Sequence, residues 1–325
     1  MLRAALHIGC TPLVRGAKLV ANRFCPPVLI LLYHRVTTLE SDPQLLSVTP
    51  GNFRAHLKYL KDHFCVARLE DDWVRLRKPA VVITFDDGYA DNALEALPIL
   101  EELQVPATFF VATSLIGSER EFWWDEVERL LICQREYPPS FELSLSGKIW
   151  NRPTAQAPDR LRLYHEILPI LRSLAPETRG ELLERLRLWS GAAPQGRASH
   201  RVLSGEELRR VAASPLVTLG AHTVSHSPLS VLPASRQLEE VAGSKQWLEG
   251  FTGETVQVFS YPFGSKADYT AETVAICREA GFARTCSNFP GQWRGRTDLH
   301  QLPRQLVRNW DLETFKLQLT RFWTS

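Results

Sequence analysis

Two adjacent carboxylates, Asp86 and Asp87, follow directly after a short apolar run in the segment TFDDGY, residues 84–89. Adjacent residues at the end of a strand point in different directions, so one carboxylate can ligate a metal while the other acts as a base. Gly88 permits a tight turn beside them. Taken alone, Asp-Asp-Gly is more often typical of a loop whose aspartate caps a helix.

A second polar pair, His222 and His226, lies in HTVSH and again follows an apolar run, LVTLGA at residues 216–221. In a helix or a compact turn, spacing of four residues aims both imidazoles the same way. Neutral imidazole and carboxylate are the usual ligands of a catalytic zinc or a similar divalent ion. Histidines four apart are often a coincidence, but together with the aspartate pair they predict a metal-dependent hydrolytic site.

Two further polar groups follow apolar runs: His34 comes after VLILLY, and the segment YPFG, residues 261–264, comes after VQVFS. In barrels of parallel strands, the carboxyl ends of the strands collect the catalytic groups. We therefore expect four strand ends to meet at one site. For His34, a hydrogen-bonded position at the rim of the barrel is an equal alternative.

The elements that must position these residues follow an alternating pattern. Helix-period segments separate the apolar runs, which predicts an α/β fold with a parallel sheet. Thr49 is the predicted cap of one helix, and Asp91, Ser235 and Thr270 are predicted to open three more. The predicted strands are VLILLY (28–33), VVITF (81–85), ATFFVA (107–112), LVTLGA (216–221) and VQVFS (256–260).

Residues from about 118 to 203 interrupt this alternation, because they are rich in Arg, Glu and Leu and contain several prolines. We interpret them as a helical insertion in a single barrel domain spanning residues 27–325, preceded by a basic N-terminal segment, residues 1–26. The insertion begins with an aromatic segment, residues 122–125, which either reaches over the site or forms part of the insertion's own core. The second interpretation is favoured because aromatic clusters usually pack together.

Over about residues 31–306 the sequence resembles the polysaccharide deacetylases of carbohydrate esterase family 4, the NodB-homology group, on the basis of TFDDGY, HTVSH and YPFG. The resemblance implies a distorted (β/α)7 barrel that removes acetyl groups from an N-acetylated sugar with a divalent metal, commonly Zn²⁺. It implies that Asp86 is the catalytic base and that Asp87, His222 and His226 are the metal ligands.

The third motif departs from the usual family pattern, because Ser260 stands where most members have an arginine that orients the catalytic aspartate. The YPFG form resembles a branch that includes exopolysaccharide deacetylases. We expect Arg304 to orient Asp86 instead, with an ordinary barrel-closing arginine as the alternative. The predicted substrate-binding residues are Tyr261, Pro262, Phe263 and Gly264.

The general acid is the second departure, because the family's late Leu-x-His motif is reduced here to Leu299-His300. Deacetylases of poly-N-acetylglucosamine carry a Tyr-His pair on an early strand, which Tyr33-His34 matches. The resemblance therefore favours His34 as the acid, with His300 as the second candidate.

Composition limits the partners and the location. The 38 basic and 36 acidic residues nearly balance, so the chain has no strong field to attract nucleic acid.

The six cysteines are scattered, and the N-terminus lacks the apolar core of a signal peptide. We expect a cytoplasmic bacterial enzyme, with residues 1–26 resting on the inner face of the membrane or packing as a solvated helix under the barrel.

The expected partner is an N-acetylated glycan or its precursor, in exopolysaccharide biosynthesis. Two alternative functions stay open at the level of sequence. One is a carbohydrate-binding barrel without catalysis, and the other is a metal-dependent hydrolase of a different amide.

Overall fold

A parallel sheet forms the centre of the computed structural model, which describes residues 26–134, 136–145 and 148–324. The basic N-terminal segment lies outside the described residues up to residue 25, so its membrane contact stays a prediction. The strands occur in the order β11-β10-β9-β6-β5-β1-β12, and β4 pairs with β5. Their bounds are β1 (Val28–Tyr33), β4 (Cys65–Val66), β5 (Ala80–Phe85), β6 (Ala107–Val111), β9 (Val217–Ala221), β10 (Val258–Ser260), β11 (Arg284–Cys286) and β12 (Gln305–Leu306).

Five of these strands, β1, β5, β6, β9 and β10, form where the apolar runs predict them. Every residue of β1, β5 and β6 is buried, as expected for parallel strands covered on both faces. The sheet curls until its two edges approach, since Cys286 of β11 forms a parallel bridge with Leu302, shortly before β12. The predicted distorted barrel of the α/β class is confirmed.

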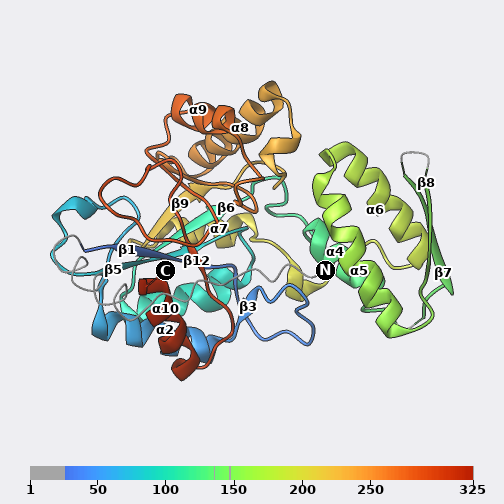
Figure 1. Ribbon diagram of the computed structural model, residues 1–325, viewed down its shortest axis with the longest axis horizontal. Coiled ribbons are helices and arrows are strands. Elements are labelled where there is room, and N and C mark those ends of the chain that lie inside the picture. Colours follow the sequence, from blue (N-terminus) through green and yellow to red (C-terminus); the bar gives the residue numbers. More distant parts are fainter. Residues whose placement is uncertain (1–25, 135, 146–147, 325) are drawn as a thin grey trace, which may run out of the picture.

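Helices surround this sheet, with α8 (Ala234–Thr252) and α9 (Ala271–Glu279) on one side and α2 (Pro50–His63) and α10 (Leu312–Thr324) on the other (Figure 1). Thr49 caps α2 by accepting from the backbone N–H of Asn52 at 3.3 Å, and Thr270 caps α9. The remaining barrel helices are α3 (Leu97–Leu103) and α7 (Gly205–Ala213). No helix among the described residues is long and apolar enough to cross a membrane.

Of the predicted helix caps, Ser235 is wrong, and Asp91 stands at the predicted N-cap position without capping through its side chain. The Asp91 side chain makes no cap hydrogen bond and instead binds the buried Arg35 guanidinium at 2.9 Å, because an unpaired buried charge would cost more than a lost cap. A π-helical turn, residues 92–96, follows it and leads into α3. Ser235 lies inside α8, which begins one residue earlier.

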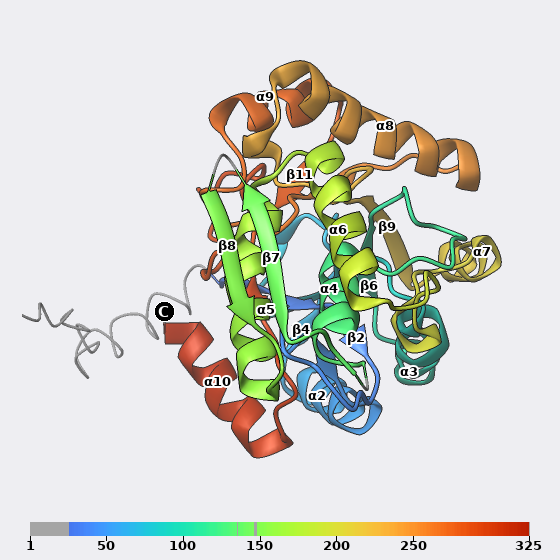
Figure 2. The ribbon, with the colours of Figure 1, turned by 90° about the vertical axis from the view of Figure 1, so that its right-hand side faces the viewer.

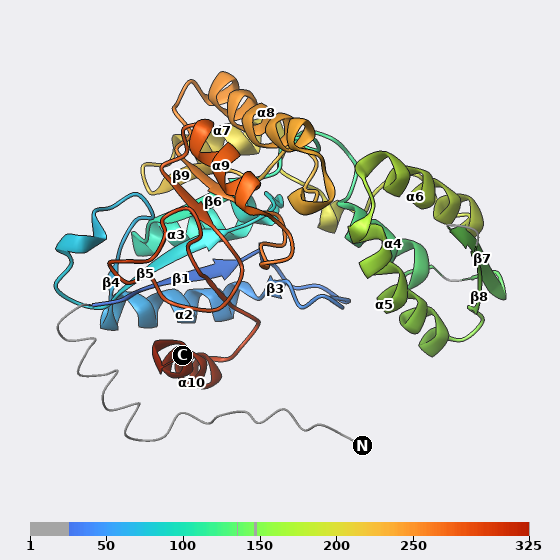
Figure 3. The same ribbon diagram turned by 45° about the horizontal axis from the view of Figure 1, so that its top comes forward.

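The insertion forms a lobe beside the barrel (Figures 1 and 3). It contains α4 (Trp123–Leu131), α5 (Ala157–Ser173) and α6 (Pro176–Ser190), as predicted, but also an unpredicted antiparallel hairpin, β7 (Ser140–Leu145) and β8 (Lys148–Pro153). The hairpin lies on the outer side of these helices (Figure 2). In β7, buried Phe141 and Leu143 alternate with exposed Glu142 and Ser144, a strand pattern too short to stand out among helical neighbours.

Candidate active site

The carboxyl ends of the parallel strands bring the predicted polar groups together. Asp86 and Asp87 follow β5, and His222 and His226 follow β9, with β6 between these two strands. These four residues and His34, which follows β1, line one cavity of about 340 Å³. Residues far apart in the chain therefore form a single site.

Three of these side chains fit a divalent ion. The Asp87 Oδ1 atom lies 3.1 Å from His226 Nε2 and 3.5 Å from His222 Nε2, and the two Nε2 atoms are 3.1 Å apart. All three residues are buried, and their ligand atoms lie within 4.8 Å of one another. One carboxylate oxygen and two imidazole nitrogens leave room for water and substrate at a catalytic zinc-type ion.

The two histidines are oriented by different means. The His222 Nδ1 atom lies 2.7 Å from the carbonyl oxygen of Ser260 and donates to it, so the Nε2 atom faces Asp87. The His226 ring packs among aromatic rings, with centroids 4.6 Å from Trp124 and 4.9 Å from Phe263. Packing rather than a hydrogen bond at Nδ1 thus fixes the second histidine, among the described residues.

The ionisation states of Asp87 and His226 suit metal binding. Burial acts to raise the pKa of Asp87, but hydrogen bonds from His222 and His226 outweigh it and hold that pKa well below its usual range. Burial lowers the pKa of His226, so its neutral form is favoured. An ionised carboxylate beside neutral imidazole is the state in which these residues act as ligands.

The backbone of the site is strained. Among the described residues six non-glycine residues have positive φ, and four of them belong to the motifs: Asp87 (78°), Thr223 (66°), His226 (53°) and Phe263 (60°). Such conformations cost about 1–3 kcal/mol each and persist where the surrounding structure imposes them. The HTVSH segment is therefore a compact turn rather than a helix.

Asp86 is held by Arg304 at the base of the cavity. Arg304 Nη1 donates to Oδ1 at 2.7 Å and Nη2 to Oδ2 at 2.6 Å, while Nε donates to the carbonyl oxygen of Ser287. Burial acts to raise the pKa of Asp86, but the Arg304 charge outweighs it and keeps that pKa below its usual value. The orienting role of Arg304 stays a prediction, which this bidentate contact supports.

The sequence prediction missed one member of this group. The hydroxyl of Ser260 donates to Asp86 Oδ2 at 3.1 Å and accepts from Arg304 Nη2 at 2.8 Å. In the sequence Ser260 appeared only as the residue that replaces an arginine. Arg304 lies immediately before β12, so the guanidinium reaches Ser260 and Asp86 from a distant part of the chain.

Of the two candidate acids, only His34 lies near the carboxylates. Burial lowers the pKa of His34, and Asp87 and Asp86 act in the opposite direction. His300 does not line the cavity. Its carbonyl oxygen accepts from the hydroxyls of Tyr261 and Thr285.

Of the YPFG segment, Phe263 lines the cavity and Tyr261, Pro262 and Gly264 do not; substrate binding by these residues stays a prediction. Tyr261 extends β10, donates its N–H to Cys286 and stacks on Tyr269 at 4.1 Å. Gly264 has a φ of 67° and would place a Cβ atom 2.6 Å from the backbone nitrogen of Asn288. These residues shape the turn that presents Phe263.

Two arginines of the cavity, Arg172 and Arg308, were not predicted. Arg172 comes from α5 of the insertion, and Arg308 follows β12 and donates to the carbonyl oxygen of Gln44 at 2.8 Å. No local motif marks either residue. Only the packing of the insertion against the barrel brings Arg172 to this place.

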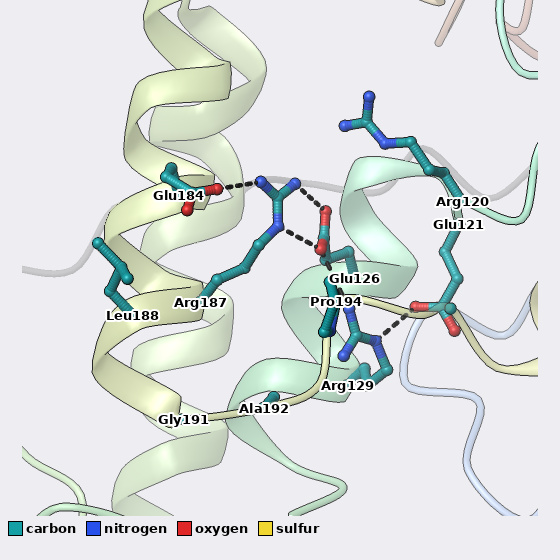
Figure 4. A pocket seen from close by; sticks show the side chains of 11 residues that line it. Arg120, Glu121, Glu126, Arg129, Glu184, Arg187, Leu188, Gly191, Ala192 and Pro194 are labelled. Carbon is teal, nitrogen blue, oxygen red and sulfur yellow. Dashed lines mark hydrogen bonds and ion pairs between the residues drawn. The ribbon is translucent and has the colours of Figure 1, made fainter.

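Two other polar clusters lie in the insertion. A cavity of about 560 Å³ is bordered by Glu121 and Glu126, but Arg129 pairs with both carboxylates and Arg187 pairs with Glu126 (Figure 4). Asp125, Glu128 and His200 form a second buried group of possible ligand atoms. There the Arg197 guanidinium lies 3.2 Å from Glu128, so a cation is already present.

Comparison with known proteins finds similarity to one family over part of the chain, and a shared fold. The polysaccharide deacetylase family model matches residues 74–132 and 191–284, which include TFDDGY and HTVSH. YxkH of Bacillus subtilis strain 168, whose name describes it as a candidate polysaccharide deacetylase, is 32% identical over 108 residues, or 31% of this chain and 37% of that protein. The chain thus matches well under half the length of this relative.

Two solved structures share the fold. BC0361, a polysaccharide deacetylase from Bacillus cereus, gives a TM-score of 0.59 at 19% identity and covers 91% of this chain and 70% of that chain. The Streptococcus pyogenes deacetylase PplD in complex with acetate gives a TM-score of 0.57 at 17% identity, covering 90% of this chain and 98% of that chain.

Proposed function

We propose that this chain, whose membership of the polysaccharide deacetylase family the comparisons support, is a metal-dependent hydrolase that releases acetate from an N-acetylated sugar of a polysaccharide or its precursor. The observation that carries the proposal is the pairing of two groups in one cavity. Asp87, His222 and His226 form a ligand set, and Asp86, held by Arg304, lies beside it.

The ligand set would hold a divalent ion, which we propose to be Zn²⁺. When bound there, the ion supplies Lewis acidity that polarises the acetamide carbonyl and lowers the pKa of water. Two neutral imidazoles and one carboxylate are the donor set that zinc prefers in catalytic sites.

The chain's own residues then move the protons. Asp86, ionised at neutral pH, takes a proton from the attacking water as its oxygen bonds to the carbonyl carbon. Arg304 fixes both carboxylate oxygens, so the base keeps one orientation. His34, which follows the adjacent strand β1 and lines the same cavity, gives a proton to the nitrogen as the C–N bond breaks. The products are acetate and a free amino sugar.

The third motif has the YPFG form, with Ser260 beside Asp86 and with Arg304 coming from the segment between β11 and β12. This form supports membership of the exopolysaccharide deacetylase branch. We therefore propose an exopolysaccharide, or the precursor from which it is made, as the physiological substrate.

Acetate release from N-acetylated oligosaccharides, measured with and without added zinc, tests the proposal. Asp86→Asn should lower kcat by about 10²- to 10⁴-fold, the usual contribution of a general base. Asp62→Asn, at an exposed position of α2, is the matched control and should have no effect. Glycan binding without acetate release would indicate a binding barrel, and turnover only of other amides would indicate a different hydrolase.

A further inference from the structure

The acid His34 differs from the other site residues in how its side chain is held. Asp86 and His222 are held by hydrogen bonds, and His226 by aromatic packing. The Nδ1 atom of His34, by contrast, has no hydrogen-bond partner among the described residues. We propose that Asn92 is a positioning residue that fixes the backbone of His34, and with it the place from which the imidazole gives its proton. The inference rests on the proposed function, in which His34 is the acid.

The backbone of His34 lies where the chain leaves the main sheet. Strand β1 ends at Tyr33, which pairs with Phe85 of β5. The next strand, β2 (Arg35–Val36), pairs with β3 (Ser47–Val48) in a separate two-stranded sheet. His34 therefore belongs to neither strand, and its carbonyl oxygen needs a donor from outside the strand ladders.

The side chain of Asn92 supplies this donor. Its Nδ2 atom donates to the carbonyl oxygen of His34 at 2.9 Å and to Asp91 Oδ1 at 3.3 Å. Two acceptors at the same end of the amide determine that its nitrogen, rather than its oxygen, faces His34. Asn92 is fully buried and does not line the cavity, so it acts on His34 through the backbone and does not touch the substrate.

Asp91 holds the residues that follow His34. Its Oδ1 atom accepts from the backbone N–H of Val36 at 2.9 Å, and its Oδ2 atom accepts from Arg35 Nε at 2.9 Å. Asn92 and Asp91 thus hold three consecutive residues of the chain. Of these contacts, the one from Asn92 is made to His34 itself, so its loss should release the acid while the neighbouring residues stay anchored.

The loop after β5 carries both the base and this support of the acid. Asn92 follows shortly after Asp86 in FDDGYADN, residues 85–92. The backbone N–H of Asp86 donates to the carbonyl oxygen of Tyr33 at 3.1 Å, immediately before His34. The loop therefore sets the position of the acid relative to the base, and small errors in such positions are costly in rate.

Two substrates that differ in their leaving group test the inference. An N-acetylated chitooligosaccharide releases an amine, which needs a proton as the C–N bond breaks, whereas p-nitrophenyl acetate releases a weakly basic phenolate that needs none. With zinc present, Asn92→Leu should lower kcat for acetate release from the saccharide by about 10- to 10²-fold, with KM little changed. Hydrolysis of the ester should be little changed. Asp86→Asn, which removes the base, should slow both reactions.

Combination with a variant of the acid separates positioning from a general loss of structure. His34→Gln should show the same selective loss on the saccharide. If Asn92 acts through His34, the double variant should be no slower on the saccharide than His34→Gln alone. Asn92→Ala leaves a space instead of an apolar side chain, and should repeat the selectivity of Asn92→Leu even where the larger residue impairs folding.

Gln237→Leu is the matched control, because Gln237 of α8 is also a buried amide that donates to a backbone carbonyl, that of Leu232, at 2.9 Å. It does not line the cavity, so it should alter stability without a selective loss on the saccharide. Thermal stabilisation by zinc should be the same for Asn92→Leu as for the wild type, since the three metal ligands are unchanged.

The possible failures of the inference and of the proposed function are distinct. Equal losses on the saccharide and the ester in Asn92→Leu, or a further loss in the double variant, would overturn the inference and leave the proposed function intact. The same selectivity in Gln237→Leu would also overturn it. A wild-type chain that hydrolyses the ester but releases acetate from no saccharide would overturn the proposed function, and this inference with it.

Discussion

The bidentate contact between Arg304 and Asp86 gives the sharpest prediction. Arg304→Met keeps much of the side-chain volume but removes the guanidinium. The Asp86 carboxylate then stays buried, and of the two residues that bind it, Arg304 and Ser260, only Ser260 still donates a hydrogen bond. Two hydrogen bonds of 2.7 and 2.6 Å to a charged group are lost. At about 1.5–3 kcal/mol each, their loss matches the 3–5 kcal/mol that breaking a buried ion pair typically costs.

The expected result has two parts. Unfolding in urea should show a loss of about 3–5 kcal/mol. Acetate release should show kcat lowered by about 10²-fold or more with KM little changed, because Asp86 loses its orientation and burial then raises its pKa. Arg304→Lys keeps the charge but not the planar fork, and should recover part of the stability and less of kcat.

Arg284→Met is the control, since Arg284 of β11 is half-buried and contacts the carbonyl oxygens of Leu69 and Asp71 and the ring of Trp73, outside the site. It should lower stability without a selective loss of kcat. The reasoning fails if Arg304→Met remains folded and retains wild-type kcat, or if Arg284→Met lowers kcat as strongly.

Three further predictions concern the ion, pH and packing. Zinc at about 100 times its Kd should stabilise the chain by about 2.7 kcal/mol, measured by thermal unfolding. His226→Gln should abolish this stabilisation. An equal stabilisation of the variant would place the ion elsewhere. Burial lowers the pKa of His56 to about 4. Between pH 6.5 and 4 the unfolded chain therefore takes up a proton that the folded chain does not. The free energy of unfolding should fall as the pH falls through this range, by up to about 3 kcal/mol. Urea unfolding at pH 7 and 4.5 measures this loss, and His56→Phe, which can keep the stacking on Phe315, should reduce it. Gly220→Ala would place a Cβ atom 2.4 Å from the Phe110 ring and should cost about 1–3 kcal/mol, whereas Gly250→Ala, with no atom nearby, should be neutral or stabilising by thermal unfolding.

The strands and the convergence of the motif residues could be predicted because they depend on local pattern. Strands buried on both faces, such as β1 and β5, appear in the sequence as unbroken apolar runs. Parallel strands place their carboxyl ends at one edge, so Asp86 and His222 had to meet once the sheet was inferred.

What the sequence did not reveal depends on contacts between distant segments. Asp91 was predicted to cap a helix because no pattern in the neighbouring sequence indicates that Arg35 is its partner. Tyr261 was predicted to bind substrate as part of the YPFG motif, but it directly follows β10 and its ring is buried against Tyr269. Arg172 reaches the cavity only through the docking of α5, which no periodicity encodes.

The aromatic packing around His226 links two parts of the molecule thermodynamically. Trp124 belongs to α4 of the insertion, and its indole N–H donates to Tyr89 of the barrel at 2.8 Å while its ring contacts His226. Any ion that selects this orientation of His226 also favours the docked lobe, and by reciprocity loosening the lobe must weaken ion binding by the same free energy. The insertion and the ligand set thus share one equilibrium, so the lobe's hydrogen exchange should report on occupancy of the site.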